Sequence, residues 1–94
     1  HEYPVSLSKQ HLANIKADFP AGDVAEVIAE LGRITTSETM DSQDNLDNAI
    51  GAILKLSKGN IVELKGLVDA AKIDFRDVIY WWYLENKKAT HPDG

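Results

Sequence analysis

The apolar residues of this chain recur every three or four positions, in segments separated by glycine, proline and polar residues. That spacing places them along one side of an α-helix, whereas a half-buried strand alternates at every second position. Strand-like alternation and internal repeats are absent from the sequence. We therefore predict an all-α protein, a compact bundle of about five short helices at residues 8–18, 24–32, 43–57, 61–72 and 75–86.

Residues that start and end helices separate these segments. Pro20 follows the first segment, Gly32 ends the second and Gly59 follows the third, and both residue types commonly end helices. Asp74 opens the last segment, where an acid accepts hydrogen bonds from free amide groups. Residues 33–42 are polar and carry no helical pattern, so we expect a mobile linker there, with flexible tails at 1–5 and 87–94.

The length and the lack of cysteine limit how such a fold is stabilised. Ninety-four residues match the size of one domain, and we expect a single helical domain over 1–94. Without cysteine there are no disulfides or thiolate metal sites, so packing must hold the core, and a cytoplasmic location is favoured. Because the sequence opens on His1 without a charged-then-apolar leader pattern, we expect its first residue to be a tag remnant.

The charge and hydropathy of the chain argue against two classes of partner. The net charge is −5 and the pI is about 5.0, which is the wrong sign for neutralising nucleic-acid phosphates or binding an anionic membrane surface. No apolar run reaches the roughly 18 residues that a membrane-spanning helix needs. We predict a protein that binds neither nucleic acid nor membrane.

Four consecutive aromatic residues at positions 80–83 are the most unusual feature. Successive helical positions advance by about 100°, so these side chains point all the way round the helix and cannot share one core. If Phe75, Val78 and Trp82 face the core with Ile79, a second face remains. It contains Asp77, Tyr80, Trp81 and Leu84. Either another element of the same chain, such as the N-terminal segment 3–5, covers this face, or it docks against a protein partner or a second copy of the chain.

No catalytic, metal-binding or cofactor-binding motif emerges elsewhere. Arg76 is a candidate for a structural ion pair with an acid on a neighbouring helix, or for contact with an external anion. The acids between residues 41 and 47 fail the calcium-loop pattern because position 46 is leucine and position 52 is alanine. His11 lacks an oriented partner that the sequence can name. We therefore predict no cofactor, no metal and no catalytic residue.

Three segments resemble a recurring pattern in small bacterial helical proteins that have no assigned activity. They read Ala52-Ile53-Leu54-Lys55-Leu56-Ser57-x-Gly59, Leu64-x-x-Leu67-Val68 with Ala70 or Ala71, and Asp74-Phe75-Arg76-Asp77-Val78-Ile79. Leu12, Ile15 and Asp18-Phe19-Pro20 are similar to the upstream part of the pattern. The resemblance implies a bacterial, cytoplasmic, helical protein and implies no substrate. Trp81 and Trp82 depart from it, since smaller residues are expected there.

These observations predict a non-catalytic protein–protein interaction or regulatory module that acts through its C-terminal helix. The alternative is a small-ligand-binding protein or a minor enzyme with a cleft near Arg76, His11 and the acids of residues 41–47.

Overall fold

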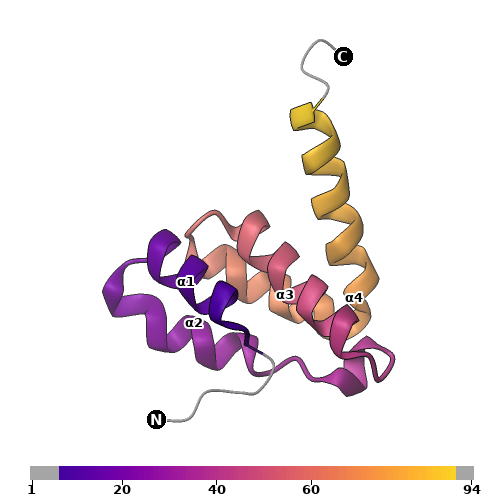
Figure 1. Ribbon diagram of the computed structural model, residues 1–94, viewed down its shortest axis with the longest axis horizontal. Coiled ribbons are helices and arrows are strands. Elements are labelled where there is room, and N and C mark those ends of the chain that lie inside the picture. Colours follow the sequence, from indigo (N-terminus) through magenta and orange to yellow (C-terminus); the bar gives the residue numbers. More distant parts are fainter. Residues whose placement is uncertain (1–6, 91–94) are drawn as a thin grey trace.

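Helix α3 (Gln43–Ser57) lies at the centre of the fold in the computed structural model, which describes residues 7–90, with side chains through Lys87 (Figure 1). It starts where the Ser42 hydroxyl accepts a hydrogen bond from the Asn45 amide. It ends at Lys58 and Gly59, which both adopt left-handed backbone angles. Between these ends its inward residues are fully or almost fully buried, and these are Leu46, Ala49, Ile50, Ala52, Ile53, Leu54 and Ser57.

Two shorter helices precede α3 in the chain, and the first of them packs against it. Helix α1 (Lys9–Asp18) begins at Ser8, whose hydroxyl accepts from the His11 amide, and it buries Ile15. A single 3-10 turn, η1 (Ala21–Asp23), leads into α2 (Val24–Leu31). The first three predicted helices are thus present with ends within a residue or two of the expected ones.

The last helix, α4 (Ile61–Thr90), replaces two predicted helices, so the prediction of five helices is wrong and the described residues form four α-helices. Asp74 alone departs from helical geometry, with φ −158° and ψ 104°, and α4 changes direction there (Figure 1). The predicted break at residues 73–74 is therefore a kink, because one extended residue redirects the chain without a loop. The helix also continues to Thr90 instead of ending near residue 86.

The segment predicted as a mobile polar linker, 33–42, is folded against α3 and α4. It contains a second 3-10 turn, η2 (Thr36–Thr39), in which the Thr35 amide donates to the Glu38 carboxylate at 2.7 Å. Ile34 and Thr39 are buried, and the Thr39 hydroxyl, with one hydrogen to donate, lies 3.3 Å from the Thr36 carbonyl oxygen and 3.1 Å from the Ser42 carbonyl oxygen. Buried side chains and satisfied polar groups make this segment part of the fold.

One hydrophobic cluster contains residues from all four helices. Ile15 of α1, Leu31 of α2, Ile53 of α3 and Val68 of α4 belong to it, and each is at most 1% exposed. None of the helices in the described part of the chain is both long and apolar enough to cross a membrane. The predicted flexible tails lie outside the described residues, apart from the end of α4.

Candidate functional site

The segment of α4 after the kink, residues 75–90, is here called distal α4. Figure 1 shows it rising away from the other helices, with its first turns beside α3. Its inner side belongs to the core: Phe75 and Val78 are buried, and Ile79 and Trp82 pack against the same cluster while staying partly exposed. This is the placement expected from the helical spacing.

The opposite side of distal α4 carries large apolar side chains that are exposed to solvent. Tyr80 is 58% exposed, Trp81 41% and Leu84 39%. Asp77 is exposed on the same side. At about 100° per residue, these four positions centre roughly 180° away from the buried ones. They are named the outer face, and they are the residues that the sequence singled out as a second face.

A second exposed aromatic residue on this helix lies off the outer face. Tyr83 is 53% exposed, and the Lys87 ammonium lies 6.0 Å from its ring centroid in a cation–π arrangement. The helical position of Tyr83 is between the outer and inner sides. It therefore offers an internal reference for the outer face: the same helix and similar exposure, but a different direction.

Arg76 sits at the kink and pairs locally. Its Nε lies 2.9 Å from Asp74 Oδ1, its Nη2 lies 3.1 Å from Asp74 Oδ2, and its backbone amide donates to Asp74 Oδ1 at 3.0 Å. The bidentate guanidinium contact and the amide hydrogen bond lower the pKa of Asp74, and the same contact raises the pKa of Arg76. The acid that pairs with Arg76 thus belongs to its own helix, and the Asp74 carboxylate caps the helical segment that follows the kink by accepting from the Arg76 amide.

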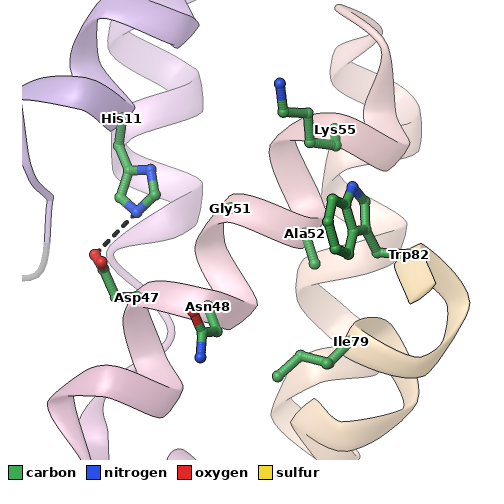
Figure 2. A pocket seen from close by; sticks show the side chains of 8 residues that line it. All are labelled: His11, Asp47, Asn48, Gly51, Ala52, Lys55, Ile79 and Trp82. Atoms are coloured by element: carbon green, nitrogen blue, oxygen red, sulfur yellow. Dashed lines mark hydrogen bonds and ion pairs between the residues drawn. The ribbon is translucent and has the colours of Figure 1, made fainter. Parts of the chain in front are cut away.

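Arg76 is not among the residues that line the groove found beside distal α4 (Figure 2). The groove has a volume of about 430 Å³ and runs between α1, α3 and distal α4. Figure 2 shows His11 on one side and Trp82 with Ile79 on the other, with the backbone of Gly51 between them. The lining residues are His11, Asp47, Asn48, Gly51, Ala52, Lys55, Ile79 and Trp82.

His11 forms one wall of this groove, and its side chain contacts an aspartate of α3. Its Nε2 lies 2.9 Å from Asp47 Oδ1, and the residue is only 8% exposed. An ionised carboxylate only accepts, so Nε2 donates, and in the neutral ring Nδ1 is left as an acceptor. Nδ1 is buried and has no hydrogen-bond partner in the described part of the chain. A general base must offer a nitrogen to its substrate. Here one nitrogen is engaged by Asp47 and the other is buried, so neither is open to a molecule in the groove.

The structure brings together only part of the cleft considered from sequence. His11 and Asp47 meet although they are 36 residues apart, whereas Arg76 lies elsewhere, and Asp41 and Asp44 are exposed without lining the groove. Among residues 7–87, no three histidine or acidic side chains gather into a group that would hold a metal ion. Sequence spacing did not indicate Trp82 and Gly51 as groove residues, because the groove arises from packing between helices.

Comparison with protein-family models, with curated proteins and with solved structures finds no match for this chain. The resemblance to small bacterial helical proteins stays a prediction. Functional inference therefore depends on the outer face and the groove themselves.

Proposed function

We propose that this chain is a non-catalytic protein-interaction module that docks a helix of another protein molecule along its outer face. The observation that supports this proposal is the exposure of Tyr80, Trp81 and Leu84 together on one side of a projecting helix. Aromatic residues and leucine supply the buried centre of helix-mediated interfaces, while such side chains seldom cluster on surfaces that stay in water.

The charge of the chain favours a protein partner. At −5 it opposes binding to phosphate backbones, since that affinity comes from neutralising phosphates with basic side chains. A cysteine-free chain with helical packing alone fits a reducing compartment, so we place the interaction in the cytoplasm of a bacterial cell, as the family resemblance implies.

Photo-cross-linking from single positions tests this proposal. A photoreactive amino acid replaces Leu84 on the outer face or, as the control, Val62, which is 75% exposed on the other part of α4. In the native cell we expect a discrete adduct from position 84 and none from position 62. Irradiation of the purified chain together with the purified partner must give the same adduct. A smear, or the same adducts from both positions, would contradict a docking role.

The groove supports a second candidate, binding of a small apolar ligand. Its walls combine Trp82 and Ile79 with the covered His11, and its floor is opened by Gly51, where a Cβ would meet only the His11 ring at 3.5 Å. Concave, mostly apolar sites with a few polar groups are typical of ligand pockets. A fragment library screened by the fluorescence of Trp82 in a Trp81→Phe variant tests it. Gly51→Leu should fill the groove and abolish every genuine hit, and hits that persist in that variant would exclude the groove.

A further inference from the structure

We infer that the partner of the outer face is a second copy of this chain, paired antiparallel along distal α4; this inference rests on the proposed function and specifies its partner. Four residues carry it. Asp77, Trp81, Leu84 and Lys88 follow one another at intervals of four, three and four on a helix that is continuous from residue 75 to residue 90. That is the spacing of the contact seam between two paired helices.

The seam is complementary to itself. The interval from Asp77 to Trp81 equals the interval from Leu84 to Lys88. In one antiparallel register, Asp77 of each copy therefore faces position 88 of the other, while Trp81 faces Leu84. An acid meets a base at both ends, and the apolar residues meet in the middle. A two-fold interface requires this kind of reciprocity, in which residue i contacts residue j and j contacts i.

The charges also select the orientation. A parallel pair would set Asp77 against Asp77 and Lys88 against Lys88, which is repulsive at both ends. The antiparallel pair turns both into attraction. The rest of the molecule does not obstruct antiparallel pairing, because Phe75 and Val78 are buried against the remaining helices on the inner side. The body of each molecule thus lies behind its own helix, away from the partner.

The size of the seam predicts a weak dimer. It offers one tryptophan, one leucine and the flanking Tyr80 from each copy, all partly exposed already. Interfaces of this kind bury well under the roughly 1,600 Å² of a standard interface, and they correspond to dissociation constants on the order of 10 to 100 µM. A monomer–dimer equilibrium should therefore be visible only at high concentration.

Sedimentation velocity of the full chain across this concentration range tests the inference. Trp81→Ala with Leu84→Ala should remove the dimer, whereas Tyr83→Ala, exposed on the same helix but off the seam, should keep it. Asp77→Lys should weaken the dimer about tenfold, because attraction becomes repulsion at both ends. Lys88→Asp should do the same. The double variant Asp77→Lys with Lys88→Asp should restore association, because the pair is reversed but complementary.

Asp18→Lys, at the exposed end of α1, changes the net charge by the same amount and should leave the dimer intact. Rescue by the double variant supports antiparallel pairing. If the alanine variants abolish association but the charge swap gives no rescue, the register is wrong while docking on the outer face stands. A wild-type chain that stays monomeric overturns the second copy as partner, and cross-linking at position 84 to a different protein would then keep the proposed function.

Discussion

Replacing Gly59 by alanine is expected to destabilise the protein strongly. Gly59 has φ +81°, and a Cβ there would overlap the backbone carbonyl oxygen of Asp18. A left-handed conformation costs a residue with a Cβ roughly 1–2 kcal/mol. Relief of the overlap requires the α3–α4 turn to move away from the end of α1, because a carbonyl cannot rotate aside as a side chain can, and overpacking of this kind costs about 1–3 kcal/mol. Together these give about 3 kcal/mol.

Gly66 provides the matched control in the same protein. It lies inside α4 with no atom within 4 Å of a Cβ, so Gly66→Ala should gain about 0.5–1 kcal/mol from helix propensity. Thermal unfolding followed by circular dichroism measures both. At roughly 4–8 °C per kcal/mol for a domain of this size, the two melting temperatures should lie more than about 10 °C apart. A Gly59→Ala variant as stable as wild type would refute the close contact between the turn and α1.

Two further predictions concern the helix faces and the effect of acid. Val78→Ala should cost about 2 kcal/mol, since it removes two methyl groups from a fully buried site, whereas Leu84→Ala should change stability by less than about 0.5 kcal/mol; thermal unfolding at low concentration compares them. The pKa of Glu38 is lowered from 4.5, first by the hydrogen bond from the Thr35 amide and then by Lys72. A lowered folded-state pKa means that this stabilisation is complete above pH 4.5 and is lost as the pH falls through the folded-state value. Glu38→Gln should flatten that part of the stability profile, and an unchanged acid slope would show that the carboxylate contributes nothing.

The helices with a clear apolar period were predictable, and α3 illustrates why. Its residues 43–57 combine a capping serine, a continuous apolar stripe and a terminal left-handed turn, and each of these signals is local. Segment 33–42 has none of them. Its order comes from the Thr35–Glu38 contact and from burial of Ile34 and Thr39 beneath α3 and α4, which depends on residues far along the chain. A short 3-10 turn has too few residues for a period to show.

The candidate site divides in the same way. The outer face follows from helix geometry applied to residues 75–84, so Tyr80, Trp81 and Leu84 were predictable from the sequence alone. The groove was only half anticipated. His11 and Asp47 were both considered, but their contact depends on how α1 crosses α3, and the wall formed by Trp82 depends on the kink at Asp74. Sequence periodicity defines the faces of each helix and does not define which helices meet.

The solvent exposure of Trp81 shows whether a second copy covers the outer face. In a Trp82→Phe variant Trp81 is the single tryptophan. Quenching of its fluorescence by acrylamide then measures how accessible the indole ring is from the solvent. We predict strong quenching at low micromolar concentration, because the side chain is 41% exposed in one molecule, and clear protection near millimolar concentration as the second copy covers it. Quenching that is weak at every concentration would show Trp81 buried by its own chain, and quenching that stays strong throughout would show that no second copy docks there.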